Sequence, residues 1–198
     1  MENKPVALNE PFDRFDRWYK KAEKSETGLP EAMTLATVSK DGRPSARMVL
    51  LKGWGHDGFV FYTNLESRKA QQLSDSPVAA LVFYWKSLRR QVRVEGHVEA
   101  VSDAEADDYF ASRPRSSQIG AWASRQSRPM QGRFEFEAAI AKYTAEFGMG
   151  EVLRPDHWSG FKIVPDRIEF WKDRQFRLHE RIDYQRCEGG WTTSMLYP

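Results

Sequence analysis

Short apolar runs, separated by turn residues, recur along most of the chain and predict β-strands. The cleanest alternation lies in residues 91–101, where Val92, Val94 and Val98 share one face and polar side chains share the other. A turn sequence at residues 40–43 (Lys-Asp-Gly-Arg) joins two of the runs as a hairpin. Strands are expected at residues 33–39, 45–52, 59–63, 78–85, 91–101, 160–164, 168–172, 182–187 and 191–196.

Helical spacing interrupts this pattern of strands. The aromatic side chains of residues 12–19 recur at helical intervals and predict a helix over residues 12–23. Ser102 and Glu105 form a capping-box pair that opens a second helix, which ends before Pro114. Two more helices are expected, at residues 116–123 and 132–147.

The order of these elements favours an antiparallel barrel. Many short strands with hairpin turns are interrupted by a few helices, and the two types do not alternate as they do in a parallel α/β sheet. We therefore predict a mainly β fold of the α+β class, an antiparallel β-barrel with peripheral helices. Residues 1–11, which are polar and contain two prolines, are expected to form a flexible N-terminal tail, and residues 12–198 a single domain.

The composition is that of a soluble globular protein. Of 198 residues, 40% are hydrophobic and 29% are charged, which suits one domain with a sizeable core. The single cysteine, Cys187, excludes an internal disulfide and favours a reducing compartment. We find neither a signal peptide nor a membrane span, so we expect a cytoplasmic protein with no membrane partner. The net charge of +2 argues against nucleic-acid binding.

Basic charge is nevertheless concentrated in one stretch, between Arg113 and Phe134. This stretch holds five arginines and no acidic residue, and serines and glutamines lie among the arginines. Guanidinium and hydroxyl groups are good donors to phosphate oxygens. The stretch therefore predicts a localised anion site.

Two further groups of cations lie where predicted strands begin or end. Arg47 and Lys52 stand at the two ends of an apolar run, and residues 67–69 (Ser-Arg-Lys) stand where a helix is expected to follow the strand at 59–63. The N-terminus of a helix offers free N–H groups to an anion. Solvated strand ends and an ordinary N-cap with surface charges are the alternative explanations.

A third group consists of Arg177, His179 and Arg181, which share one face if strand alternation applies there. Solvated residues of an edge strand would give the same pattern. The histidines and Cys187 show no metal-ligand spacing, so we predict no metal. Because no Ser–His–Asp triad or pair of hydrolytic carboxylates stands out, the cationic and aromatic groups are best suited to a phosphorylated, planar, electron-accepting ring.

Nine short motifs in a fixed order carry a resemblance to a known family, and they span the chain from about residue 31 to its C-terminus. The chain resembles the pyridoxine/pyridoxamine 5'-phosphate oxidase family, FMN-dependent enzymes that make pyridoxal 5'-phosphate. The motifs are residues 47–52 (RMVLLK), 61–64 (FYTN), 67–69 (SRK), 90–91 (RQ), 112–115 (SRPR), 117–122 (SQIGAW), 126–127 (QS), 168–171 (IEFW) and 177–179 (RLH).

The resemblance implies a split β-barrel homodimer with two FMN sites at the subunit interface. It also implies hydride transfer from C4' of pyridoxine or pyridoxamine 5'-phosphate to flavin N5, followed by reduction of O2 to H2O2. Arg177 and His179 match the catalytic pair beside the reacting carbon. The substrate-binding residues that it implies are Lys52, Tyr109, Arg113, Ser117, Arg177, Leu178 and His179. The implied FMN-binding residues are Arg47, Met48, Val49, Leu50, Leu51, Lys52, Tyr62, Thr63, Arg68, Lys69, Gln91, Gln126, Ser127, Trp171 and Arg181.

Two features depart from the family pattern. Family members often carry a longer N-terminal segment, rich in Arg and Tyr, that folds over the substrate; residues 1–5 show no counterpart, so we expect the lid to be absent or supplied differently. Many relatives also place an arginine where Met195 stands. The alternative functions are a split-barrel flavin oxidase acting on another ring system, of the phenazine-pathway type, and a non-catalytic flavin- or haem-binding module.

Overall fold

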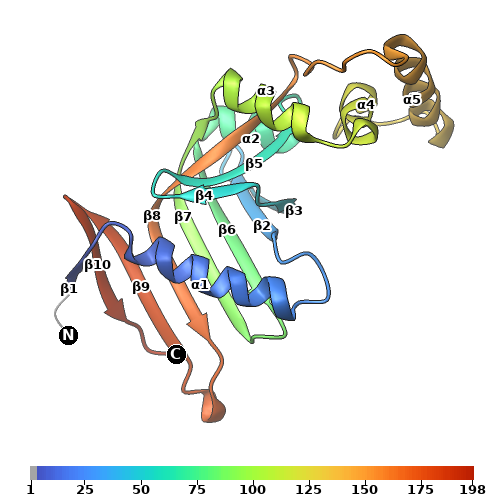
Figure 1. Cartoon of the computed structure of the whole chain (residues 1–198). Coiled ribbons are helices and arrows are strands. Elements are labelled where there is room, and N and C mark those ends of the chain that lie inside the picture. Colours follow the sequence, from blue (N-terminus) through green and yellow to red (C-terminus); the bar gives the residue numbers. More distant parts are fainter. Residues whose placement is uncertain (1–3) are drawn as a thin grey trace.

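The computed structural model describes residues 4–198, in which one antiparallel sheet carries helices at one end and across one face (Figure 1). Within these residues, no helix is both long and apolar enough to cross a membrane. The helices are α1 (Glu10–Ser25), α2 (Arg68–Asp75), α3 (Asp103–Ser112), α4 (Arg115–Ala123) and α5 (Arg133–Phe147), with a short 3-10 turn, η1 (Gln175–Arg177). The strands are β1 (Lys4–Val6), β2 (Ala32–Val38), β3 (Pro44–Leu50), β4 (Gly53–Gly55), β5 (Gly58–Asn64), β6 (Val78–Trp85), β7 (Arg90–Ala100), β8 (Trp158–Lys172), β9 (Glu180–Cys187) and β10 (Gly190–Met195).

The long strand β8 is where the two parts of the sheet meet. On one edge it pairs with β7; on the other, residues 158–163 pair with β5 and residues 167–172 pair with β9. The main path of the sheet is β1-β10-β9-β8-β7-β6-β2-β3, and the β4–β5 hairpin joins it beside the first half of β8. Because one edge of β8 serves two neighbours in turn, the sheet divides there. This confirms the predicted antiparallel, split-barrel architecture with peripheral helices.

The middle of β8 differs from the two separate strands predicted at 160–164 and 168–172. One strand spans both ranges, with a register shift against β7 next to Gly96. Pro165 pairs with Gly96, and a Cβ on that glycine would lie 2.0 Å from the carbonyl oxygen of Val164. The bulge and the missing side chain together let a proline lie inside a central strand.

Aromatic side chains of α1 fix this helix across the sheet. Phe15 is fully buried, and its ring lies 5.0 Å from Phe59 on β5 and 5.1 Å from Phe83 on β6, measured between centroids. Phe12 contacts Trp191 on β10 in the same edge-to-face manner, at 6.1 Å. Such pairs add to the free energy that aromatic burial supplies. The helix therefore ties together strands from both sides of the split.

A second, smaller core lies where α3, α4 and the start of β8 meet. Phe110, Ile119 and Trp158 are buried there, and Trp122 extends the cluster by packing against Tyr143 of α5. This core holds α3 and α4 beside the first half of β8. Figure 1 shows α2, α3 and α4 gathered at this end of the molecule.

The N-terminal segment differs from the flexible tail predicted for residues 1–11. Residues 4–6 form β1 and pair with β10, and α1 begins at Glu10 with Pro11 in its first turn. The edge of β10 offers unpaired backbone groups, which can pair with a neighbouring segment whatever its side chains. Residues 1–3 lie outside the described residues.

Replacing Gly96 by alanine tests the role of the bulge in β8. The new Cβ would collide with backbone atoms of β8, which cannot move aside as a side chain can, so we expect Gly96→Ala to lower the free energy of unfolding by about 1–3 kcal/mol. Urea unfolding at one fixed protein concentration measures the loss. Gly28→Ala is the matched control, because no atom lies within 4 Å of its Cβ position. Equal midpoints for the two variants would contradict this account of the bulge.

Candidate functional site

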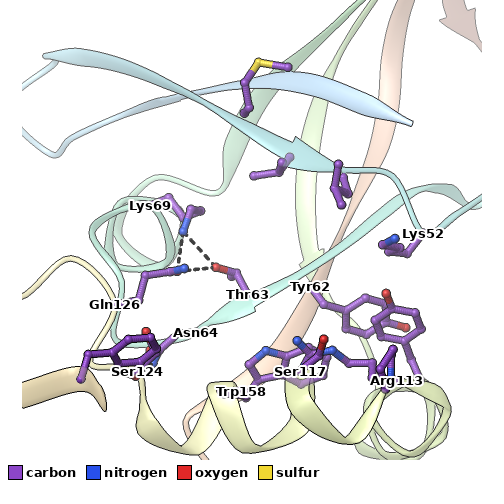
Figure 2. A pocket seen from close by; sticks show the side chains of 18 residues that line it. Lys52, Tyr62, Thr63, Asn64, Lys69, Arg113, Ser117, Ser124, Gln126 and Trp158 are labelled. Atoms are coloured by element: carbon purple, nitrogen blue, oxygen red, sulfur yellow. Dashed lines mark hydrogen bonds between the residues drawn. The ribbon is translucent and has the colours of Figure 1, made fainter. Parts of the chain in front are cut away.

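A cavity of about 640 Å³ opens between β3, β5 and the helices α2, α3 and α4 (Figure 2). Its wall includes backbone and side chains from segments that are distant in sequence, as the predicted anion site requires. Among the described residues, no aspartate or glutamate lines it. The predicted site residues that line this cavity are Met48, Val49, Leu50, Lys52, Tyr62, Thr63, Lys69, Tyr109, Arg113, Ser117 and Gln126.

A buried ammonium group, that of Lys69, lies at one end of the cavity. Its Nζ donates to Gln126 Oε1 at 2.7 Å, to Thr63 Oγ1 at 2.9 Å and to Ser67 Oγ at 3.2 Å. Ser67 also caps α2 by accepting from the backbone N–H of Ala70. Figure 2 shows the triangle formed by Lys69, Thr63 and Gln126. The start of α2 thus presents both a cation and a helix N-terminus to the cavity.

Burial and a neighbouring guanidinium lower the pKa of Lys69 to about 8, with burial the larger cause. The guanidinium belongs to Arg47, whose Nη atoms donate to Thr37 Oγ1 and Ser45 Oγ, both at 2.6 Å. Burial, and then the charge of Arg68, also lower the pKa of Arg47. The smaller cause of each lowered pKa is a neighbouring cation, Arg47 for Lys69 and Arg68 for Arg47, so these charges lie near one another. An anion bound there would relieve this repulsion.

A second cationic group, the guanidinium of Arg113, lies at the other end of the cavity. It stacks over Trp158, with 4.6 Å from Cζ to the ring centroid. Its Nη1 is buried and has no hydrogen-bond partner among residues 4–198. Burial is the main cause that lowers the pKa of Arg113. A buried donor without an acceptor is costly, so this atom is suited to receive an oxygen from a ligand.

Three aromatic rings form a stack beside Arg113. The rings of Tyr62, Tyr109 and Trp158 are nearly parallel and all contact one another, with centroid distances of 4.0 Å (Tyr62–Tyr109), 5.3 Å (Tyr62–Trp158) and 6.1 Å (Tyr109–Trp158). Figure 2 shows Lys52 and Ser117 on the same side of the cavity as this stack. The cavity therefore has two cationic ends, and it is suited to more than one phosphate group.

Tyr109, Arg113 and Ser117 line one cavity, although no single helix runs through all three. Helix α3 ends at Ser112, and both Arg113 and Pro114 have extended ψ angles before α4 begins. The proline prevents its predecessor from staying helical. The three side chains converge because the turn between α3 and α4 folds around the cavity.

Six of the predicted residues lie at the opposite end of β8, near the turn into β9 (Figure 1). Trp171 follows Gly160 by eleven residues, which corresponds to about 35 Å of extended strand. Gly160 pairs with Tyr62 at the cavity, whereas Trp171 pairs with Gln91 and Arg181. One chain therefore separates its predicted site residues into two groups. The distant group is Gln91, Trp171, Arg177, Leu178, His179 and Arg181.

Strand alternation does not apply to residues 177–181, so that prediction is wrong. Arg177 ends the 3-10 turn η1, and its φ of 61° follows a φ of 56° at Phe176. The strand β9 begins only at Glu180. Arg181 donates to the buried carboxylate of Glu169 at 2.7 Å. Arg177 and His179 are therefore held by a strained turn, and only Arg181 belongs to the sheet.

The remaining predicted residues lie around the cavity without lining it. Arg47 lies near Lys69 but does not line the cavity. Arg68 is exposed on the first turn of α2. Leu51 is directed into the main core, at 3% exposure. Ser127, with a φ of 71°, lines a neighbouring hollow that shares Gln126 with the cavity.

Sequence reasoning missed seven residues that line the cavity. Asn64 belonged to a quoted motif but was not assigned to the site. Trp158 carried no signal, because a tryptophan before an apolar run has the pattern of a core residue. The seven missed residues are Asn64, Pro114, Gly120, Ala121, Ser124, Phe136 and Trp158.

Comparison with known proteins identifies the class and then the family. The fold and the cavity define the class: a split-barrel protein whose cavity is lined by cationic side chains. A family model described as Pyridoxamine 5'-phosphate oxidase matches residues 20–146, and one described as Pyridoxine 5'-phosphate oxidase C-terminal dimerisation region matches residues 158–198. The chain belongs to the pyridoxamine 5'-phosphate oxidase family, as the resemblance predicted.

Curated relatives match nearly the whole chain. The pyridoxine/pyridoxamine 5'-phosphate oxidase of Azorhizobium caulinodans is 62% identical over 195 residues, which cover 98% of this chain and 92% of the relative. That of Rhizobium meliloti is 58% identical over 192 residues, covering 96% and 93%.

Solved structures share the fold. PhzG from Burkholderia lata, in complex with tetrahydrophenazine-1-carboxylic acid, superposes with a TM-score of 0.90 at 29% identity and covers 95% of this chain and 92% of its own. A pyridoxamine 5'-phosphate oxidase-related, FMN binding protein from Nostoc punctiforme has a TM-score of 0.76 at 18% identity, covering 95% and 98%, and supports the fold alone.

The lowered pKa of Lys69 predicts that the site binds a phosphate monoester such as FMN more weakly at high pH. Only the protonated ammonium attracts the anion, and its charge is lost as pH rises through about 8. Phosphate stays dianionic over this range, because its second pKa is about 6. We expect the Kd of FMN, measured by quenching of flavin fluorescence, to rise roughly 10-fold from about pH 7 to about pH 9.5.

The matched control is Lys69→Arg, which stays charged at both pH values. Its Kd should change little over the range, even if its affinity at neutral pH is lower. A wild-type Kd that is flat across the same range would contradict the assigned role of Lys69.

Proposed function

We propose that this chain is an FMN-dependent oxidase that converts pyridoxine 5'-phosphate or pyridoxamine 5'-phosphate to pyridoxal 5'-phosphate. The observation that carries the proposal is the cavity with two cationic ends and no lining carboxylate in residues 4–198. The curated relatives, at about 60% identity over nearly the full chain, carry the name of this oxidase. The two family models span both parts of the split sheet.

The donor set at the Lys69 end fits the phosphate of FMN. Lys69, Arg47 and Arg68 together form a cluster whose charges repel one another, as the lowered pKa values indicate. The first turn of α2 adds free backbone N–H groups. Thr63 and Gln126 already hydrogen-bond Lys69 and hold its ammonium at the cavity wall. When bound, FMN accepts the hydride and passes two electrons to O2, which becomes H2O2.

The donor set at the Arg113 end fits the phosphate of the substrate. Arg113 Nη1 needs an acceptor, and Ser117 and Lys52 line the same part of the cavity. The stacking of Arg113 over Trp158 holds the guanidinium plane in one orientation. A charge-assisted bond from a preoriented donor contributes roughly 1.5–3 kcal/mol.

We further propose that each site is completed by a second copy of the chain. Arg177 and His179 lie about 35 Å of strand away from the cavity of their own subunit, so they cannot act on a ligand bound there. In a homodimer, the turn between β8 and β9 of one subunit would reach the cavity of the other. The match of residues 158–198 to a dimerisation region supports this arrangement. Residues 12–198 then act as one FMN-binding unit, and the cytoplasmic location stays a prediction.

The principal alternative is an oxidase that acts on another ring system. The structural likeness to PhzG is the reason to consider it. The relatives named for the vitamin B6 oxidase are about twice as similar in sequence as PhzG, at 58–62% against 29% identity. The unpartnered Nη1 of Arg113 beside Ser117 also favours a ligand with a phosphate at that end.

A substrate panel tests the proposed activity. The purified, flavin-loaded protein should consume O2 and form H2O2 with pyridoxine 5'-phosphate or pyridoxamine 5'-phosphate. The unphosphorylated vitamers should be turned over far more slowly, because they leave Arg113 without its acceptor. Equal rates with phosphorylated and unphosphorylated vitamers, or turnover of a tetrahydrophenazine carboxylic acid alone, would sink the substrate assignment.

Mixed dimers test whether the two groups of residues act across the subunit boundary. Arg113→Ala removes a cavity donor and Arg177→Ala removes a distant one, so we expect each variant alone to lose most turnover. Unfolding and refolding an equal mixture should restore about a quarter of wild-type turnover, because half of the dimers are mixed and each has one intact site. No recovery, while both variants still dimerise and bind FMN, would contradict the shared site.

A further inference from the structure

The imidazole of His179 is held by a carboxylate that neither the motifs nor the family comparison assigns to the site. Asp173 Oδ1 lies 3.1 Å from His179 Nδ1. The ring also lies against Trp171, with 4.8 Å between centroids and 43° between the ring planes. The side chains of Asp173 and His179 are largely shielded from solvent, with exposed fractions of 27% and 21%. The ring therefore contacts both an aromatic side chain and a carboxylate.

This geometry determines which ring nitrogen carries the proton in the neutral imidazole. If Nδ1 were unprotonated, its lone pair would face the lone pairs of the carboxylate at hydrogen-bond distance. The backbone N–H of Arg174 also points to Nδ1, but at 3.4 Å it is the longer and uncharged contact. Because the contact with the carboxylate is the shorter one and involves a charge, we expect Nδ1 to donate to Asp173 in the neutral ring, which leaves Nε2 free.

Asp173 is itself anchored to a neighbouring turn. Its backbone N–H donates to the carbonyl of Arg89 at 3.0 Å, and its Oδ2 accepts from Arg89 Nη1 at 3.3 Å. The two carboxylate oxygens thus serve different partners, Arg89 and His179. The segment from Asp173 to His179 contains Phe176 and Arg177, whose positive φ angles need support from outside the turn. Asp173 provides that support at the point where the turn leaves β8.

We infer that Asp173 is a positioning residue for the oxidase reaction: it orients His179 with Nδ1–H bound to its carboxylate and Nε2 presented to the substrate in the partner's cavity. The inference rests on the proposed function, because it assigns His179 to the substrate. An orienting carboxylate behind a histidine fixes both the tautomer and the ring plane, which a solvent-exposed histidine lacks.

Kinetics of two variants form the first part of the test. Asp173→Ala should lower kcat by about 10- to 100-fold, the range seen when an outer orienting partner is lost. Its KM and its Kd for FMN should stay near the wild-type values, because Asp173 lies outside the cavity that binds both phosphates. Asp173→Asn should recover part of the loss, since its amide oxygen can still accept from Nδ1–H. The exposed ion pair of Asp16 with Lys20 on α1 offers the control Asp16→Ala, which should match wild type.

The protonation site of His179 is the second readout, and it does not depend on turnover. The chain has only four histidines, so selective 15N labelling and the variant His179→Gln assign the resonance. In the neutral ring of the wild-type dimer, Nδ1 should be the protonated nitrogen, and Asp173→Ala should shift the equilibrium toward Nε2–H.

The outcomes separate the inference from the proposed function. An unchanged kcat in Asp173→Ala, or ring resonances that are the same in wild type and Asp173→Ala, overturns the role of Asp173. A loss in Asp173→Ala that lies in FMN affinity or KM, with kcat retained, also overturns it in favour of a structural role. If the wild type oxidises neither substrate while the ring resonances still shift, the proposed function fails and the link between Asp173 and His179 stands.

Discussion

The 15-residue strand β8 sets the distance between the two groups of polar residues in this protein. Its first half forms one wall of the cavity through its pairing with β5, and its far end carries Trp171 and the turn with Arg177 and His179. A strand in a sheet cannot fold back on itself, and pairing along β7, β5 and β9 keeps β8 extended. The two groups stay apart within one chain, and in the proposed homodimer a second chain would unite them. The split sheet would then present each half-site to a partner.

Electrostatics explains why the cavity suits two ligands that each carry one phosphate group. Lys69, Arg47 and Arg113 are all partly buried, and burial lowers the pKa of each. Their desolvation is an unfavourable contribution to folding that bound phosphates can offset. The hydrogen bonds from Lys69 to Thr63 and Gln126 keep the charge at the wall instead of letting it reach solvent. The buried charges that favour phosphate binding therefore lower the folding stability of the unliganded protein.

Local patterns predicted most of the strands and helices, because alternation and capping depend only on neighbouring residues. The run at residues 78–85 and the capping box of Ser102 are examples, and both were confirmed. The predictions failed where a distant contact prevails. Gly96 lets β8 continue through Pro165, and the edge of β10 recruits residues 4–6 as a strand. Neither effect has a signature within its own segment.

The candidate site was predicted by resemblance more than by residue pattern. The resemblance named eleven residues that line one cavity, but no pattern within the sequence explains why Arg113 and Ser117 meet, and Trp158 carried no signal at all. The ordered motifs also could not tell that Arg177 and His179 lie at the other end of β8 from the cavity. That separation depends on strand pairing, which only the folded chain reveals.

In the proposed homodimer, one chain holds only half of each catalytic site. Sedimentation velocity, recorded through flavin absorbance over a dilution series with turnover measured on the same samples, tests it most directly. The account predicts that turnover per chain falls in step with the dimer, a species of twice 23.0 kDa. A 23.0 kDa species that carries flavin and retains full turnover would contradict it.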